Sequence, residues 1–285
     1  MVRWRGRTAS TNVEDRRGMR AGPMMIGGGV GGLVLVVAAL LLGVDPRVIL
    51  GGGGSGAAIA PPAQEGAPLT PGEDEQADYL AVMLADTEQH WGEVFNDQGY
   101  RYRAPTLVYF SDAVSSACGM AGSAVGPFYC PADETIYMDL SFLDDLRSRF
   151  GAPGDFAQAY VLAHEVGHHV QNQLGVADRV AGMRQRASQA ESNALSVRME
   201  LQADCFAGVW GASQAAHDYL DPGDVEEGLR AAAAIGDDRL QRQAGGRVVP
   251  ESFTHGSSDQ RLSWFRRGFE SGDPEACDTF AGASL

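Results

Sequence analysis

A long apolar run near the N-terminus dominates the pattern of hydrophobic and polar positions along the chain. Residues 24–44, MMIGGGVGGLVLVVAALLLGV, contain no charged side chain over 21 positions. A bilayer core of about 30 Å needs about 20 helical residues to cross it. The pattern therefore predicts one transmembrane helix at 24–44, whose glycines would allow close helix contacts in lipid.

The charges on either side of this run predict its orientation. Residues 1–23 hold six arginines against Glu14 and Asp15, whereas Arg47 is the single basic residue soon after the run. Because positive flanks stay in the cytoplasm, we expect a single-pass cell-membrane protein with a cytoplasmic N-terminus and an extracytoplasmic remainder. A cleaved signal peptide is the alternative, since AAIA at 57–60 resembles a cleavage site, but the apolar run is longer than a usual signal core.

A flexible tether and one folded domain are predicted after the apolar run. Residues 45–77 are rich in Gly, Pro and Ala and cannot bury a core, so we interpret them as a linker before a domain at 78–285. Apolar spacing close to 3.6 predicts helices at 78–98, 155–174, 178–216, 222–244 and 258–269. Alternating runs predict strands at 106–110 and 135–143 in a small antiparallel sheet. The predicted fold is a mainly helical α+β domain.

Acidic side chains outnumber basic ones in this domain. The whole chain carries a formal net charge of −15, and the part beyond the arginine-rich head is more negative still. Such a surface repels nucleic acid and anionic membrane surfaces, so we exclude both as partners of the folded domain.

Four cysteines add a constraint on the folded domain. Cys118, Cys130, Cys205 and Cys277 form an even set in a region expected to be extracytoplasmic, where disulfides persist. Of the three pairings open to them we favour Cys118–Cys130 with Cys205–Cys277, because the first closes a short glycine-rich loop. No two of them have C-x-x-C spacing, so they are not predicted to bind zinc.

Histidine and glutamate interrupt the apolar helix at VLAHEVGHHVQ, residues 161–171. His164 and His168 are four residues apart, so on a helix both imidazoles lie on one face and can reach one metal ion. Glu165 lies beside them, which completes the H-E-x-x-H pattern in which glutamate is the general base toward a metal-activated water. His169 is turned about 100° from His168, so we interpret it as a solvent-facing or supporting residue.

A third ligand is predicted from VRMELQADCFAGVW, residues 197–210. Glu200 and Asp204 are again four apart on one helical face among core-type residues. Glu200 would complete a His₂Glu zinc site, and Asp204 would accept the outer N–H of a ligand histidine. A solvated face with two acids is the alternative.

These segments resemble a known family. HEVGHHVQ followed by ELQAD is similar to the gluzincin metallopeptidases whose second motif reads E-x-x-A-D, as in the prenyl-protein endopeptidases. GPFYCP, IYMDLSF, HEVGHHVQ, ELQADCFAGVW and THGSSDQRLSWF, in this order, resemble the bacterial neutral zinc metallopeptidase family of membrane-anchored enzymes over about residues 78–280. The resemblance implies a gluzincin-like fold, a Zn²⁺ cofactor and Glu200 as third ligand.

Two further residues are candidates for the catalytic site. His255 and Arg261 lie in THGSSDQRLSWF, and either could donate a hydrogen bond to the oxyanion that forms during amide hydrolysis. A similar T-H-x-x-x-x-x-R arrangement occurs near the active site of the prenyl-protein endopeptidases, although Gly256 here replaces a proline. A surface arginine is the alternative for Arg261.

The sequence thus predicts a membrane-anchored zinc metallopeptidase acting on a peptide or protein. The segment 126–140 could supply a strand edge on which an extended substrate binds, or could be an ordinary core strand. A catalytically silent zinc-stabilised domain that binds an envelope protein or the cell wall is the alternative function. A zinc hydrolase acting on a non-peptide amide is a third.

Overall fold

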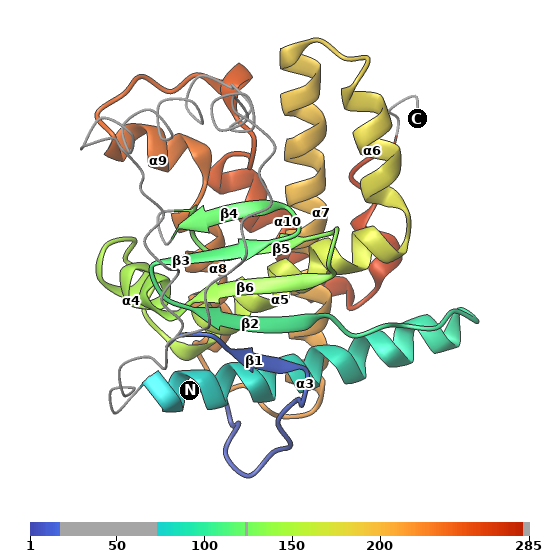
Figure 1. Ribbon diagram of the computed structural model, residues 1–285, viewed down its shortest axis with the longest axis vertical. Coiled ribbons are helices and arrows are strands. Elements are labelled where there is room, and N and C mark those ends of the chain that lie inside the picture. Colours follow the sequence, from blue (N-terminus) through green and yellow to red (C-terminus); the bar gives the residue numbers. More distant parts are fainter. Residues whose placement is uncertain (18–72, 123–124, 282–285) are drawn as a thin grey trace, which may run out of the picture.

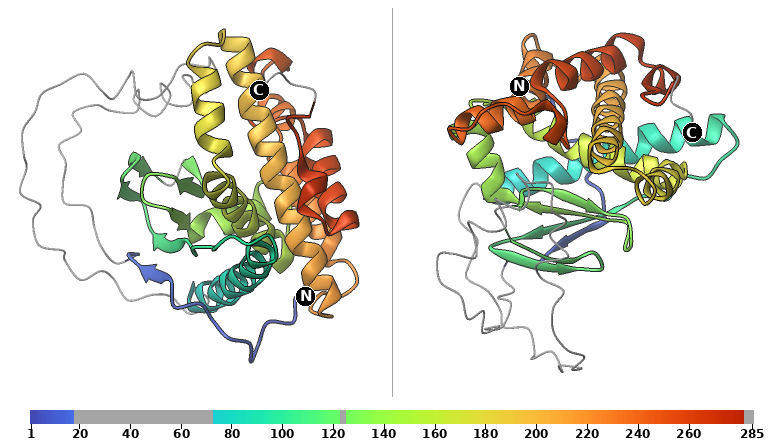
Figure 2. Two further views of the ribbon diagram at one scale, coloured as in Figure 1. Left: turned by 90° about the vertical axis from the view of Figure 1, so that its right-hand side faces the viewer. Right: turned by 90° about the horizontal axis from the view of Figure 1, so that it is seen from above.

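A layer of helices packed against one side of a small sheet makes up the described chain (Figures 1 and 2). The computed structural model describes residues 1–17, 73–122 and 125–281. The predicted transmembrane run at 24–44 lies outside these residues. Within the described ranges, every helix is too short or too polar to cross a membrane. The predicted mainly helical α+β class is confirmed.

The central sheet is mixed, with the order β1-β2-β6-β5. Its strands are β1 (Val13–Asp15), β2 (Thr106–Phe110), β6 (Thr135–Asp139) and β5 (Phe128–Cys130). β1 and β6 run parallel to β2, and only β5 is antiparallel, to β6. A separate antiparallel pair is formed by β3 (Ala113–Ser116) and β4 (Gly119–Gly122).

The prediction that 106–110 and 135–143 pair antiparallel was wrong. The chain between them first forms the β3–β4 pair and then β5, so it re-enters the sheet in the direction of β2. Parallel neighbours require such a long crossover, whereas antiparallel ones can be joined by a short turn. The second strand is also shorter than expected, because Asp139 accepts from the backbone N–H of Ser141 at 2.9 Å and starts a helix.

The predicted helices are present, but two of them are divided. The helices are α3 (Glu73–Asp97), α4 (Leu140–Ser148), α5 (Asp155–Gln173), α6 (Val176–Arg184), α7 (Gln189–Ala216), α8 (Asp224–Ala234), α9 (Asp237–Gln243) and α10 (Ser258–Ser271), with short 3-10 turns at Pro250–Ser252 and Pro274–Cys277. Ser188 and Glu191 form a reciprocal capping box that begins α7 and separates it from α6. Gly236, in extended conformation, separates α8 from α9.

Helix α5 lies at the centre of the helical layer, packed against α7, α8 and α3 (Figure 2). Its sequence is apolar on every face except at the polar motif, and a helix of this kind is stable only when it is buried on all sides. The buried residues of α5 accordingly lie around almost its whole circumference. Helix α10 packs along α7 through glycines: a Cβ on Gly268 would lie 2.0 Å from the carbonyl oxygen of Cys205. The two backbones therefore touch.

Both predicted disulfides are confirmed. Cys118–Cys130 joins the β3–β4 turn to β5, and Cys205–Cys277 joins α7 to the C-terminal 3-10 turn. The second bridge holds the end of the chain against the helix that carries Glu200.

The N-terminal residues are part of this domain. β1 pairs with β2 along three residues, and Val2 is 4% exposed within the main hydrophobic core. The sequence had placed 1–23 apart from the domain, as the flank of a membrane span.

The glycine contact between α7 and α10 generates the first prediction. Gly268→Ala should lower the free energy of unfolding by about 3 kcal/mol or more, because the new methyl group would collide with the backbone of Cys205. Gly182→Ala on α6 is the matched control, since its Cβ would meet nothing within 4 Å, and it should stabilise by about 0.5–1 kcal/mol. Denaturant unfolding of both variants measures the difference, and equal stabilities would contradict the close packing described here.

Candidate metal centre

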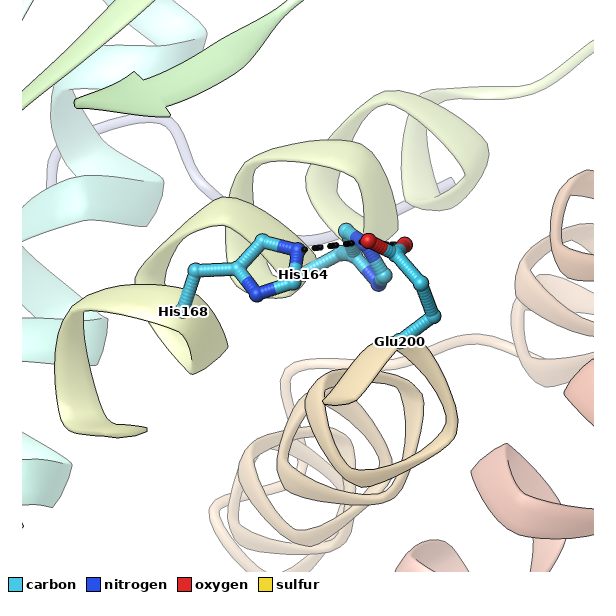
Figure 3. A group of neighbouring side chains, drawn as sticks. All are labelled: His164, His168 and Glu200. Carbon is cyan, nitrogen blue, oxygen red and sulfur yellow. Dashed lines mark hydrogen bonds and ion pairs between the residues drawn. The ribbon is translucent and has the colours of Figure 1, made fainter. Parts of the chain in front are cut away.

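Two histidines of α5 and one glutamate of α7 converge on one point (Figure 3). His164 and His168 lie one helical turn apart, with ring centroids separated by 4.8 Å. The helices cross closely beside them, because a Cβ on Gly167 would lie 2.9 Å from the backbone of Ala203. A residue without a side chain at this position lets α7 bring Glu200 within reach of both rings.

The donor set suits a zinc ion. The carboxylate of Glu200 lies 3.2 Å from Nε2 of His164 and 3.5 Å from Nε2 of His168, and one ligand atom from each residue lies within 4.8 Å of the others. Two imidazole nitrogens and one carboxylate are the protein ligands of many catalytic zinc sites, which leave a coordination position open for water or substrate. The three residues therefore fit a catalytic rather than a structural zinc site.

Acceptors behind the rings hold both imidazoles in the orientation that metal binding needs. Nδ1 of His164 donates to Oδ1 of Asp204 at 2.8 Å, and Nδ1 of His168 donates to the side-chain oxygen of Gln171 at 2.9 Å. With the Nδ1 proton committed in this way, Nε2 of each ring points toward Glu200 and can offer its lone pair to a cation.

A buried arginine supports Asp204 beside the Nδ1 edge of His164, with Nη2 of Arg261 3.4 Å from that nitrogen. Nε and Nη2 of Arg261 donate to the two carboxylate oxygens of Asp204 at 2.8 and 2.9 Å, and the hydroxyl of Tyr160 donates to Oδ1 at 2.5 Å. Burial alone would raise the pKa of Asp204, but Arg261 and His164 outweigh it, so this pKa is lowered. Asp204 is thus held as a carboxylate.

The structure corrects the predicted role of Arg261. This side chain is 2% exposed, and its guanidinium lies against Asp204 and Tyr160 rather than in front of the metal ligands. An oxyanion donor must reach the substrate. Arg261 instead positions Asp204, and through it His164.

The three candidate metal ligands shift one another's pKa values. Burial disfavours a proton on His168, but the carboxylate of Glu200 outweighs burial and raises the pKa of this histidine to about 9. The pKa of His164 is raised in the same sense, with Asp204 as the main opposing influence to burial. The pKa of Glu200 is held well below its usual range by the two histidines, despite burial. The negative charges of Glu200 and Asp204 that raise these pKa values would also favour a divalent cation, which must displace the proton from the histidines.

His255 approaches the same centre from the loop before α10. Its Nδ1 lies 3.1 Å from Oδ1 of Asp237, while Oδ2 of Asp237 accepts the backbone N–H groups of Thr254, His255 and Gly256 at 2.7 to 3.1 Å. Burial disfavours a proton on His255, but Asp237 and the charge of Glu200 raise its pKa. The His255 side chain is half exposed, and its charge and that of Glu200 influence each other's pKa, so it lies at the solvent-facing margin of the site.

Glu165 directly follows His164, within the turn of α5 that joins the two candidate ligand histidines. It is 8% exposed, and its negative charge is one of the influences that raise the pKa of His168. The glutamate is therefore close enough to the metal ligands to act at the same site.

His169 was predicted to face solvent or to support the site, and the structure shows it fully buried. Its Nε2–H donates to the carbonyl of Arg103 at 2.6 Å, and Nδ1 accepts from the hydroxyl of Tyr129 at 2.9 Å. Burial lowers its pKa, which agrees with the neutral tautomer that these partners require. His169 thus ties α5 to β5.

Sequence reasoning missed Tyr160, Gln171 and Asp237. Tyr160 and Gln171 lie one turn before His164 and three residues after His168, so helical spacing could have identified them. Asp237 carries no such signal, because its partner His255 is 18 residues away with no regular element joining them.

Comparison with known proteins agrees with this site. A family model described as "Putative neutral zinc metallopeptidase" matches residues 2–280. The chain belongs to this family. Zinc is accordingly the metal of these neutral zinc metallopeptidases, and the resemblance predicted from sequence is confirmed.

Relatives of the chain match either nearly all of it or about two thirds of it. The uncharacterized protein YpfJ of Escherichia coli strain K12 is 53% identical over 285 residues, which cover 98% of this chain and 99% of the relative. Uncharacterized proteins of Mycobacterium bovis (Mb2605) and Mycobacterium tuberculosis strain H37Rv (Rv2575) are each 49% identical over 195 residues, 65% of either chain. No solved structure matches the chain significantly.

Removing one hydroxyl behind His164 tests whether the support of Asp204 matters for zinc. Tyr160→Phe should weaken zinc binding by about 10-fold or more, because Asp204 loses a donor and orients His164 less firmly. Tyr79→Phe is the matched control: its buried hydroxyl donates to the carbonyl of Asp155, remote from the ligands. Both variants should lose about 1 kcal/mol of stability, but chelator competition should show weaker zinc binding for Tyr160→Phe alone. Equal zinc affinities would contradict the role given to this network.

The raised pKa of His168 predicts a pH dependence. Below about pH 9 the metal-free protein holds a proton on this cluster, and zinc must displace it. Zinc affinity should therefore rise about tenfold per pH unit between pH 6.5 and 8.5 for each proton released. Chelator competition across this range measures the zinc affinity. Calorimetry in buffers of different ionisation enthalpy measures the number of protons released on binding. An affinity independent of pH would show that the ligands are already deprotonated.

Proposed function

We propose that the protein is a zinc-dependent peptidase that hydrolyses peptide bonds through an activated water. The observation that carries the proposal is the three-ligand set of His164, His168 and Glu200, with Glu165 beside it. A purely structural zinc site is closed by four protein ligands and needs no base.

The roles of the side chains follow from their positions. Zinc, when bound, supplies a Lewis acid that polarises a peptide carbonyl and makes water more acidic. Glu165 accepts a proton from the attacking water and passes it to the departing amine. His255, held at Nδ1 by Asp237, donates from its outer nitrogen to the carbonyl oxygen as negative charge develops there.

An extended substrate has a strand edge to bind. β5 is the last strand of the sheet order, and Tyr129 on β5 is bonded to His169 on the helix that carries the zinc ligands. A peptide added to this edge would gain main-chain hydrogen bonds, while its alternate side chains determine specificity. We therefore propose β5 as the substrate strand, which gives the predicted edge at 126–140 a specific location.

The proposed site of action is extracytoplasmic. Cys118–Cys130 and Cys205–Cys277 are both bonded, and disulfides persist mainly in oxidising compartments. The charge-free run at 24–44 supports attachment to the membrane surface that borders this compartment.

The first test combines metal content with cleavage of an unbiased peptide library by the full-length chain. Glu165→Gln should retain zinc and lose about 10²- to 10⁴-fold in turnover, because the general base is gone. Glu270→Gln, on the exposed face of α10, is the matched control and should leave turnover unchanged. Glu200→Ala should lose the zinc.

Each other result has a defined meaning. Zinc without peptide cleavage by the wild type would favour the silent binding domain, and cleavage restricted to non-peptide amides would favour a different hydrolase. Full activity in Glu165→Gln would remove the basis of the mechanism.

A further inference from the structure

An acidic surface over α3, α7 and α8 is occupied by the chain's own arginine-rich N-terminal residues. Arg3 binds Asp218 and Asp221 at 2.9 and 2.6 Å. Arg7 binds Asp86, and its guanidinium lies 3.6 Å from the ring centroid of Tyr219. The ion pair of Arg7 is the better protected, because both of its side chains are only about one-seventh exposed, at 13% and 14%.

Backbone bonds accompany these charges along the whole segment. The N–H of Arg3 donates to the carbonyl of Tyr219 at 2.8 Å, and that of Ser10 donates to the carbonyl of Ala81 at 2.9 Å. The segment ends as β1, parallel to β2 (Figure 1). Main-chain pairing at this many points marks residues 1–17 as part of the fold rather than a loose extension.

Apolar contacts contribute as well. Val2 is buried in the main core, and Trp4 packs edge-on against Tyr79 with ring centroids 5.7 Å apart. The N–H of Val2 donates to Asp155 at 2.8 Å, beside Asp224 and Glu227. These three acids are close enough to hold a cation, and the N-terminal backbone binds there instead.

The arginines of this segment have partners in the folded domain or within the segment. Arg5 binds Glu75 on α3, and Arg16 and Arg17 bind Glu14 and Asp15. Five of the six arginines that predicted a cytoplasmic N-terminus are thus engaged in ion pairs, and the sixth, Arg20, lies outside the described residues. The positive-inside rule counts basic residues near a span and gives Asp and Glu little weight, so the attachment of residues 1–17 to the domain is the observation that bears on their location.

The two ends of the stretch 18–72 lie close together on the domain. The guanidinium of Arg17, at one end, lies 5.6 Å from the ring centroid of Tyr109. The hydroxyl of Tyr109 donates to the carbonyl of Ala77, near the start of α3, at 2.7 Å. The described residues on either side of 18–72 therefore meet at one residue of β2, which is consistent with residues 1–17 and α3 belonging to the same copy of the chain.

We propose that residues 1–17 dock in cis on this acidic surface and lie on the same side of any membrane as the metal centre. A single crossing by 24–44 would place β1 and β2 on opposite sides of the bilayer, where they could not pair. The two disulfides identify that side as the oxidising one.

Thiol labelling of intact cells tests this arrangement. All four cysteines are in disulfides, so an introduced cysteine is the single free thiol. Thr11→Cys reports on the N-terminal segment and Tyr100→Cys on the metal-binding domain, and both positions are exposed. A membrane-impermeant maleimide should label the two full-length variants to the same extent before permeabilisation, while a cytoplasmic thiol protein stays unlabelled.

Two outcomes would overturn the proposal. Labelling of Tyr100→Cys alone in intact cells would place the N-terminus across the membrane and restore the single crossing. Labelling of both variants only after permeabilisation would refute the oxidising location. Neither outcome depends on peptidase activity.

A crosslink distinguishes docking in cis from docking on a second copy. The side chains of Ser10 and Glu88 are hydrogen-bonded at 2.8 Å, so the double variant Ser10→Cys/Glu88→Cys should be bridged by a short bis-maleimide within one chain. After proteolytic cleavage of the chain between positions 10 and 88, the crosslinked protein should still migrate as a monomer of full length, because the crosslink holds the two fragments together. A dimer band from the double variant, or from a mixture of the two single variants, would show exchange between copies and overturn docking in cis.

Discussion

The close crossing of α5 and α7 is the constraint on which the metal centre depends. Two ligands lie on one helix and the third on the other, so the distance between the helix axes decides whether the three can share an ion. Gly167 against Ala203 removes the side chain that would hold the helices apart. Gly167 lies inside the ligand motif itself, between His164 and His168. The motif therefore encodes a packing contact as well as two ligands.

The metal centre also places a carboxylate, Asp204, in the core beside this crossing. Both of its oxygens are hydrogen-bonded. Asp204 is fully buried, which is tolerable only because Arg261, Tyr160 and His164 all bind it. The three partners come from α10 and α5, so the orientation of the candidate zinc ligand His164 depends on where α10 lies. The glycine contact between α10 and α7 holds that position. Stability of the helical layer and geometry of the site are thus properties of the same contacts.

Local spacing in the sequence was sufficient to predict which residues of α5 and α7 face each other, but insufficient to predict the direction of the strands or the position of Arg261. The i, i+4 spacing of His164 and His168, and of Glu200 and Asp204, anticipated the faces that meet, because helical periodicity is a local property. The pairing of the cysteines was also correct. The parallel direction of β2 and β6 could not be inferred, since it depends on the path of the whole intervening chain. Arg261 was assigned to the substrate side because spacing along the chain does not reveal which side of a ligand a residue approaches.

The arginine-rich N-terminus shows why one sequence signal can have two physical meanings. Basic residues beside an apolar run favour a cytoplasmic flank, whereas the same residues in ion pairs on a protein surface contribute to the fold. Composition is identical in the two cases, and only the positions of Asp86, Asp218 and Asp221 distinguish them. Those acids lie on α3 and after α7, far from the arginines in sequence. The strongly acidic charge of the domain then has a role beyond solubility, because it forms the surface that receives the basic segment.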